Sequence, residues 1–287
     1  MEVLSAPDEV RSRIRSIQRS GASIGVVPTM GALHAGHVSL IHAAKRDCDF
    51  VVTTVFVNPT QFGPGEDFQK YPRTLDADLE HCRNAGADLV MTPAADQMYS
   101  DGAQSIVRVT ELTKILEGAL RPGHFDGVTT VVAKLFNITL PDRAYFGQKD
   151  YQQQLVIRRM VADLNWSVEI VTCPIIREPD GLAMSSRNRY LSAEERQQAL
   201  ALSRSLFTAK DLAAAGASPD ECRLAIQAEL SEQAGVSLQY AVVADESTLQ
   251  PAGPASSSAV ALVAAKVGTT RLIDNQRLQF RSHAGFR

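Results

Sequence analysis

Two histidines, His34 and His37, stand where a short β-rich segment gives way to a helical pattern, within the stretch Pro28-Thr-Met-Gly-Ala-Leu-His-Ala-Gly-His37. Residues three apart share one face of a helix, so both imidazoles can point at the same group. A glycine-bearing turn between a strand and a helix is where a phosphate meets the free N–H groups of the helix start. The stretch therefore predicts a phosphate-binding turn, with Gly36 letting the phosphate approach the backbone.

Alternative roles for the histidine pair are weaker but stay open. A Walker A loop requires lysine after its second glycine, whereas His37 follows Gly36, and no G-x-G-x-x-G fingerprint occurs. Zinc is disfavoured because no Cys, Asp or Glu stands at ligand spacing nearby. The pair could also be two ordinary surface or core histidines. We interpret His42, farther along the same helix, as structural.

The first half of the chain alternates strand and helix patterns. The run Phe50–Val57 is almost entirely apolar or β-branched, which is typical of a strand buried on both faces of a parallel sheet. The alternation predicts a Rossmann-like, doubly wound α/β fold. Thr74 is placed to cap a helix. The predicted strands are 23–27, 50–57, 88–91, 144–146 and 167–171, and the predicted helices are 36–47, 74–85, 128–138 and 151–164.

The second half predicts a separate, smaller α+β domain. Ser192 and Ser218 each begin a capping-box pattern that opens a helix. Short strands are expected at 238–243, 260–267 and 270–273. Because prolines and a glycine punctuate residues 174–181, we place the boundary there, which gives domains 1–175 and 176–287.

Composition limits the partners of the chain. Its 287 residues carry 29 basic and 32 acidic side chains, so no basic excess is available for nucleic acid. Four cysteines without a CxxC pair are typical of reduced thiols. Neither a secretory leader nor a membrane-length apolar run is visible. We expect a soluble, cytoplasmic protein with no membrane or nucleic-acid partner.

The sequence resembles a known enzyme family. The segment His34–His37 is similar to the signature of class I aminoacyl-tRNA synthetases and related nucleotidyltransferases, and Met184-Ser-Ser-Arg187 is similar to their second, lysine- and serine-rich motif. The wider pattern resembles the pantoate–β-alanine ligase family. The similarity is carried by six separated blocks that occur in the expected order: 28–37, 56–62, 121–128, 146–153, 177–188 and 270–275.

This resemblance implies a reaction in two steps. ATP activates (R)-pantoate as pantoyl adenylate with release of pyrophosphate, and β-alanine then displaces AMP to give pantothenate. The family also implies Mg²⁺ and a homodimer. Because the attacking carboxylate is already ionised at neutral pH, the first step requires positioning and charge neutralisation rather than a general base.

The resemblance also assigns roles to particular residues. It makes His34, His37 and Lys149 catalytic, while Gln61 and Gln153 bind pantoate. The family uses the second histidine as a proton donor, whereas its chemistry favours an electrostatic stabiliser. The ATP-binding residues would be Met30, Gly31, Ala32, Leu33, His34, Ala35, Gly36, His37, Gly147, Gln148 (where many relatives have glutamate), Lys149, Asp150 (suited to the ribose), Ile176, Met184, Ser185, Ser186 and Arg187.

Several roles stay open at this point. Asn58 and Tyr71 line the entrance or serve the fold, and Arg121 and His124 either contact a substrate or stabilise a turn. An apolar wall for the pantoate methyl groups could come from Phe56, Val131, Val132 and Leu135. Two alternative functions are an adenylyltransferase that needs no amine acceptor and a catalytically silent nucleotide-binding protein. The intact set of His34, His37, Lys149 and Gln61 counts against the silent protein.

Overall fold

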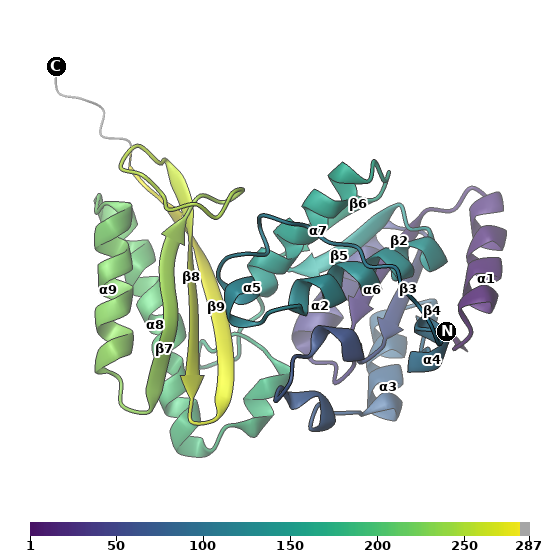
Figure 1. Cartoon of the computed structure of the whole chain (residues 1–287), viewed down its shortest axis with the longest axis horizontal. Coiled ribbons are helices and arrows are strands. Elements are labelled where there is room, and N and C mark those ends of the chain that lie inside the picture. Colours follow the sequence, from purple (N-terminus) through teal and green to yellow (C-terminus); the bar gives the residue numbers. More distant parts are fainter. Residues whose placement is uncertain (282–287) are drawn as a thin grey trace. The chain divides into compact units, whose positions relative to one another are not determined.

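The computed structural model describes residues 1–281, which form two compact units divided between Pro174 and Ile175 (Figure 1). Residues 282–287, which the sequence assigns to the second domain, lie outside the described part of the chain. The first unit contains one six-stranded sheet with the order β1-β4-β3-β2-β5-β6, in which every pairing is parallel. Its strands are β1 (Glu2–Leu4), β2 (Ile24–Thr29), β3 (Phe50–Val55), β4 (Leu89–Met91), β5 (Arg143–Gly147) and β6 (Glu169–Cys173).

Helices pack against both faces of this sheet, which confirms the doubly wound α/β fold. Successive strand residues such as Val26 and Val27 belong to two different hydrophobic cores. This arrangement explains the nearly continuous apolar strands, because alternate side chains are buried on opposite faces. Helices α1 (Pro7–Arg19), α6 (His124–Thr139) and α7 (Tyr151–Asp163) contribute to one core, and α2 (Ala35–Asp47) and α3 (Leu75–Ala85) to the other; α4 (Ala95–Met98) and α5 (Glu117–Leu120) are short.

The order of the strands fixes where a ligand can bind. Strand β2 pairs with β3 on one side and with β5 on the other. From β2 the chain adds β3 and β4 toward one edge of the sheet and then β5 and β6 toward the other, so the strand order reverses between β2 and β5. Open parallel sheets bind ligands beyond the carboxyl ends of the strands at such a switch point. The segments that follow Thr29 and Gly147 are therefore brought to one edge, and they contain the predicted catalytic residues His34, His37 and Lys149.

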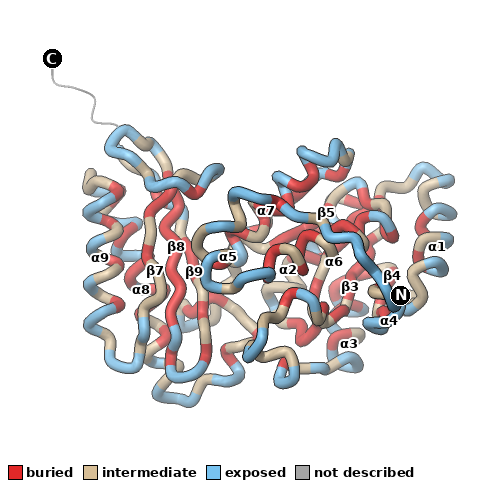
Figure 2. The backbone as a smooth tube through the Cα atoms, in the orientation of Figure 1, coloured by how far each residue is buried: buried red, intermediate tan, exposed pale blue. Residues whose placement is uncertain are grey.

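The second unit has two helices and a three-stranded antiparallel sheet of order β7-β8-β9. Helix α8 packs on β8 and β9, while α9 packs on β7. Figure 2 shows that β8 is buried along almost its whole length. The elements are α8 (Ala193–Ala215), α9 (Pro219–Glu232), β7 (Val236–Ala244), β8 (Ser258–Val267) and β9 (Thr270–Gln279).

Some local expectations are corrected. Thr74 occupies the N-cap position of α3, but its side chain does not cap the helix; its hydroxyl lies 3.3 Å from both carboxylate oxygens of Asp78. The sequence does not predict β1, because three residues are too few to show a periodicity. Helix α6 begins at His124 rather than 128, and β9 extends to Gln279 rather than 273.

Two further features concern the whole described chain. The four cysteines, Cys48, Cys82, Cys173 and Cys222, are buried and unpaired. Across residues 1–281, no helix combines the length and the apolar character that crossing a membrane requires.

The capping box of α9 gives a stability prediction. The Ser218 hydroxyl accepts a hydrogen bond from the Glu221 N–H at 3.3 Å, and the Glu221 carboxylate accepts one from the Ser218 N–H at 2.8 Å. Ser218→Ala removes the first bond and should lower the free energy of unfolding by about 1 kcal/mol in chemical denaturation. The matched control is Ser231→Ala, at an exposed position in the last turn of α9. Equal losses in both variants would contradict a capping role for Ser218.

Candidate active site

The turn between β2 and α2 has an unusual backbone. Gly31 has φ +79° and Ala32 has φ +50°, so two consecutive residues adopt the left-handed conformation. For alanine this conformation costs roughly 1–2 kcal/mol and needs support from its surroundings. Asp78 supplies it, because its carboxylate accepts hydrogen bonds from the N–H groups of Ala32 at 3.0 Å and Leu33 at 2.7 Å.

The two histidines cap the start of α2. His34 is the N-cap residue, and its Nδ1 accepts a hydrogen bond from the Gly36 N–H at 3.1 Å. The Nδ1 of His37 accepts from the His34 N–H at 3.4 Å. The ring centroids are 4.1 Å apart. Because each Nδ1 is an acceptor, a neutral ring carries its proton on Nε2, so each histidine presents an Nε2–H donor at the helix start.

His37 is electrically neutral at physiological pH. Burial lowers its pKa to about 3, and the electrostatic interactions with His34 and Lys149 act in the same direction. Lys149 lies in the short helix η3 (Gln148–Asp150), directly after β5, and its positive charge is among the causes that lower the pKa of His37. Because β2 pairs directly with β5, the segments that follow these two strands meet at the switch point of the sheet.

Gln61 lies beside the histidine turn. It ends the short helix η1 (Pro59–Gln61), and its Nε2 donates to the sulfur of Met30 at 3.0 Å. Its Oε1 accepts a hydrogen bond from the Asn58 amide at 3.1 Å. The predicted pantoate-binding glutamine is thus in contact with a predicted ATP-binding residue, Met30.

Asn58 does not line an entrance, because it is 1 % exposed. Its Nδ2 donates to Gln61 and to the Gly127 carbonyl, and its Oδ1 accepts from the Tyr99 hydroxyl at 2.8 Å. Asn58 therefore orients the Gln61 side chain from the interior. Tyr71 is also buried, with its ring against Phe62.

Arg121, at the end of α5, and His124, at the start of α6, hold the loop that contains Gln61. Arg121 makes two hydrogen bonds to the Glu66 carboxylate, at 2.6 and 2.8 Å, and it lies 3.0 Å from His124 Nε2. His124 Nδ1 lies 2.9 Å from the Gln61 carbonyl oxygen. Since arginine only donates, Nε2 accepts and Nδ1–H donates to that carbonyl. Of the two roles left open by the sequence, the contacts favour stabilisation of the turn.

The pKa values of His124 and Glu66 agree with the hydrogen bonds that these two side chains make. Burial lowers the pKa of His124 to about 4, with the nearby Arg121 charge acting in the same direction. Burial alone would raise the pKa of Glu66, but its hydrogen bond and charge interaction with Arg121 outweigh this, and the pKa is lowered. A neutral histidine and an ionised glutamate are the forms that these hydrogen bonds require.

Three consecutive glutamines at the start of α7 have different surroundings. Gln152 is buried and holds the 112–117 segment, accepting from the Glu117 N–H and donating to the carbonyls of Leu112 and Ile115. Gln154 is buried and accepts from Arg158 and Thr172. Gln153 is partly exposed. Its position suits a ligand contact better than those of its neighbours.

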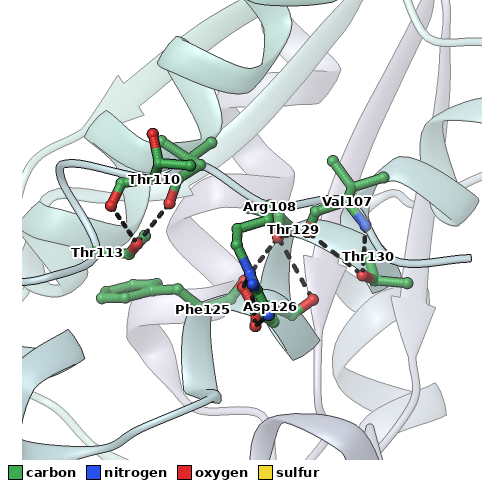
Figure 3. A network of polar contacts seen from close by, with 9 residues as sticks. Val107, Arg108, Thr110, Thr113, Phe125, Asp126, Thr129 and Thr130 are labelled. Atoms are coloured by element: carbon green, nitrogen blue, oxygen red, sulfur yellow. Dashed lines mark hydrogen bonds and ion pairs between the residues drawn. The ribbon is translucent and has the colours of Figure 1, made fainter.

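The segment before α5 is fastened to α6, as Figure 3 shows. Arg108 pairs with the Asp126 carboxylate, and the Thr129 hydroxyl donates to the carbonyls of Val107 and Phe125. A cavity of about 560 Å³ opens between these elements. Arg121 lines it, whereas His34, His37 and Lys149 do not, so it lies apart from the histidine turn.

The remaining predicted ATP-binding residues belong to the second unit. The Met184 N–H donates to the Ile176 carbonyl at 3.0 Å, which brings these two residues together. The Ser185 hydroxyl accepts from the Arg187 N–H at 3.3 Å at the start of the short helix η4 (Ser186–Tyr190), in which Ser186 is buried. Asn188 ties this loop to Glu178 and Ala183, with bonds of 2.7 and 3.0 Å.

Metal ligands do not cluster in the part of the chain that the structure describes: residues 1–281 contain no group of three or more His, Cys, Asp or Glu side chains that could hold a metal ion. The two imidazoles of the histidine turn and Lys149 of η3 are donors suited to an anion.

Comparison with known proteins identifies relatives over nearly the whole chain. A family model described as pantoate-beta-alanine ligase matches residues 2–277. The pantothenate synthetase of Moorella thermoacetica is 50% identical over 280 residues, covering 97% of this chain and 99% of the relative. The enzyme of the same name from Acidobacterium capsulatum is 53% identical over 279 residues, covering 96% and 93%.

Solved structures agree with these relatives. The pantothenate synthetase of Thermus thermophilus matches with a TM-score of 0.92 and 45% identity, covering 96% of this chain and 99% of that chain. A pantoate-beta-alanine ligase from Francisella tularensis, solved in complex with beta-gamma ATP and beta-alanine, matches with a TM-score of 0.80 and 35% identity, covering 96% and 97%.

The lowered pKa of His124 predicts a pH dependence of stability. Below about pH 6.5 the unfolded chain protonates this histidine while the folded chain does not. The contribution of His124 to the free energy of unfolding is therefore complete above that pH and is lost as the pH falls toward 4. Between about pH 6 and 5, replacing His124 with Asn should reduce the slope of unfolding free energy against pH by about 1 kcal/mol per unit. His42→Asn, at an exposed position, is the control. An unchanged slope in His124→Asn would refute the neutral, buried state of His124.

Proposed function

Because this chain belongs to the pantoate–beta-alanine ligase family, we propose that it condenses (R)-pantoate with β-alanine at the expense of ATP, through a pantoyl-adenylate intermediate. The observation that carries the proposal is the pair of Nε2–H donors on His34 and His37 beside Lys149 at the switch point of the sheet. Donors fixed in advance around a phosphate stabilise charge that develops during its transfer.

In the first step, a pantoate carboxylate oxygen attacks the α-phosphorus of ATP. The bond between that phosphorus and the β-phosphate oxygen breaks, and pyrophosphate leaves. His34 and His37 donate hydrogen bonds to phosphate oxygens, while Lys149 contributes positive charge. His37 enters this step as a neutral donor. The negative triphosphate favours its protonated form, so a proton transfer from His37 would follow nucleotide binding rather than precede it.

In the second step, the β-alanine nitrogen attacks the acyl carbon of the adenylate. The attacking amine is in its neutral form, having lost one proton to solvent. The bond from that carbon to the AMP oxygen breaks, AMP leaves, and the nitrogen loses a second proton to solvent and keeps one as the amide N–H. The enzyme contributes mainly proximity, since the mixed anhydride is already activated. The Francisella relative, whose structure contains β-alanine together with beta-gamma ATP, supports a single site that accommodates both.

Pantoate would be held by Gln61 and Gln153. An amide both donates and accepts, which suits the carboxylate and hydroxyls of this substrate. Gln61 has its Oε1 oriented by Asn58, so its orientation is fixed before a ligand arrives. The methyl groups of pantoate would face apolar side chains of the adjoining core, which includes Phe56, Val131, Val132 and Leu135.

The remaining assignments are part of the same proposal. Exposed Asp150 would accept from the ribose, and Ser185, Ser186 and Arg187 would contribute donors for the phosphates. Mg²⁺ would arrive with the nucleotide substrate and would neutralise part of its phosphate charge. We expect a homodimer, and a cytoplasmic location is consistent with the four unpaired thiols.

Pyrophosphate exchange tests the mechanism. Labelled pyrophosphate should enter ATP when pantoate is present and β-alanine is absent, because adenylate formation is reversible. His37→Ala and Lys149→Ala should each reduce this exchange by about 100-fold or more, since each removes charge stabilisation at the phosphates. The control His42→Ala alters an exposed histidine of the same helix.

The outcomes separate the candidate functions. No exchange by folded wild-type protein would overturn the adenylate mechanism. Release of ADP rather than AMP on adding β-alanine would indicate an acyl-phosphate ligase. A product completed without any amine would indicate an adenylyltransferase.

Gly127 tests the support of Gln61. A Cβ at this position would lie 2.4 Å from the Thr60 carbonyl oxygen and 2.6 Å from the Gln61 Cα, so the Gln61 backbone must move in Gly127→Ala. The KM for pantoate should rise by about tenfold or more, with the KM for ATP nearly unchanged. Gly63→Ala, where the nearest atoms are 3.9 Å away, is the matched control. An unchanged pantoate KM in folded Gly127→Ala would contradict the placement of pantoate at Gln61.

A further inference from the structure

Asp78 is a buried acid that the proposed chemistry does not use. It lies in the first turn of α3 and is 1 % exposed. An ionised carboxylate in the interior requires donors that replace water. Asp78 has the N–H groups of Ala32 and Leu33, and the Thr74 hydroxyl lies 3.3 Å from both of its oxygens. Two of these three donors belong to the histidine turn, 45 and 46 residues away in sequence.

The carboxylate also explains the shape of this turn. A Cβ on Gly31 would lie 3.0 Å from Asp78 Oδ2 and 3.1 Å from a Val55 methyl, so a larger residue would be crowded as well as strained by the φ of +79°. Ala32 tolerates its left-handed backbone while its N–H is bonded to the carboxylate. Without Asp78, two buried N–H groups lose their acceptor, and the turn loses the contact that compensates its strain.

The effect of this contact reaches the imidazoles through a short stretch of backbone. Leu33, whose N–H is held at 2.7 Å, directly precedes His34. The His34 N–H then donates to His37, and the His34 ring caps the helix through Gly36. A rotation of the backbone at residues 32–33 would therefore change the position of both rings. Misplacement of a catalytic group by about 1 Å can cost about 100-fold in rate.

We propose that Asp78 is a positioning residue for nucleotide binding, whose carboxylate sets the turn that places His34 and His37. This inference rests on the proposed function for the identity of the nucleotide. The amides of Ala32 and Leu33 then serve Asp78 rather than a phosphate. These two residues, predicted to bind ATP, would contribute the shape of the turn.

The test compares two aspartates that hold opposite ends of β2. Asp78→Asn replaces a carboxylate oxygen with an NH₂ group that faces a backbone donor. The matched control is Asp142→Asn, because Asp142 accepts the Ile24 N–H at 2.7 Å at the amino end of the same strand. For Asp78→Asn we expect the KM for ATP to rise by about tenfold or more and kcat to fall, with the pantoate KM within about twofold of wild type.

A merely structural role would give a different result. Asp142→Asn and Asp78→Asn would then lower stability or the yield of folded protein, while both KM values stayed at wild type. That outcome, measured per folded molecule, would overturn the proposal. Equal increases of the ATP KM in both variants would overturn it as well.

A second variant and a binding assay make the test independent of folding and of turnover. Thr74→Val removes only the hydroxyl at 3.3 Å and should raise the ATP KM in the same direction by a few-fold. If Asp78→Asn does not fold, an unchanged ATP KM in Thr74→Val overturns the proposal. Equilibrium dialysis with ATP alone should show weaker binding to Asp78→Asn than to Asp142→Asn. If the wild type fails the exchange assay, the proposed function is wrong, and the dialysis still decides the role of Asp78.

Discussion

The hydrogen bond from the Gly36 N–H to His34 Nδ1 connects the chemistry of this chain to its fold. It satisfies a donor at the start of α2 and, in the same contact, fixes the tautomer of the neutral ring that carries its proton on Nε2. His37 repeats the arrangement by accepting from the His34 backbone. The imidazoles are thus part of the helix cap, and their orientation depends on where β2 ends and α2 begins.

Support for this arrangement comes from buried polar side chains rather than from regular secondary structure. Asp78 holds the histidine turn, Asn58 and His124 hold Gln61, and Gln152 holds the segment before α5. Each of these side chains is at least nine-tenths buried. Loops alone would place the reactive groups imprecisely, and buried hydrogen bonds give them a single geometry.

Much of the fold could be predicted from the sequence because its signals are local. The apolar run of β3 predicts a buried parallel strand, and Ser192 and Ser218 begin helices that the structure confirms. The sequence pattern places the start of α6 too late because Gly127 lowers the helical propensity there. The reason for this glycine is the close approach of the Thr60 carbonyl, which sequence patterns do not reveal.

In the candidate site too, the sequence predicts features that depend on local spacing but not those that depend on contacts between distant segments. The spacing of His34 and His37 predicts their shared helix face, and the structure places them and Lys149 together. The sequence marks Asp78 only as an acid near a helix start, since its contacts with Ala32 and Leu33 depend on the packing of α3. An amide suits either an entrance or the interior, so the sequence cannot decide where Asn58 lies. Its bonds to Gln61 and Tyr99 place it in the interior.

The three glutamines at the start of α7 constrain the number of residues between β5 and α7 as well as the residue types there. Successive helix residues are rotated by about 100°, so Gln152, Gln153 and Gln154 face three directions with three kinds of neighbour. Inserting one residue between Gly147 and Tyr151 would leave all three amides in the sequence. It would nevertheless rotate the buried anchor of the 112–117 segment into the position of the partly exposed residue. Substitutions are therefore easier for this segment to accommodate than changes in its length.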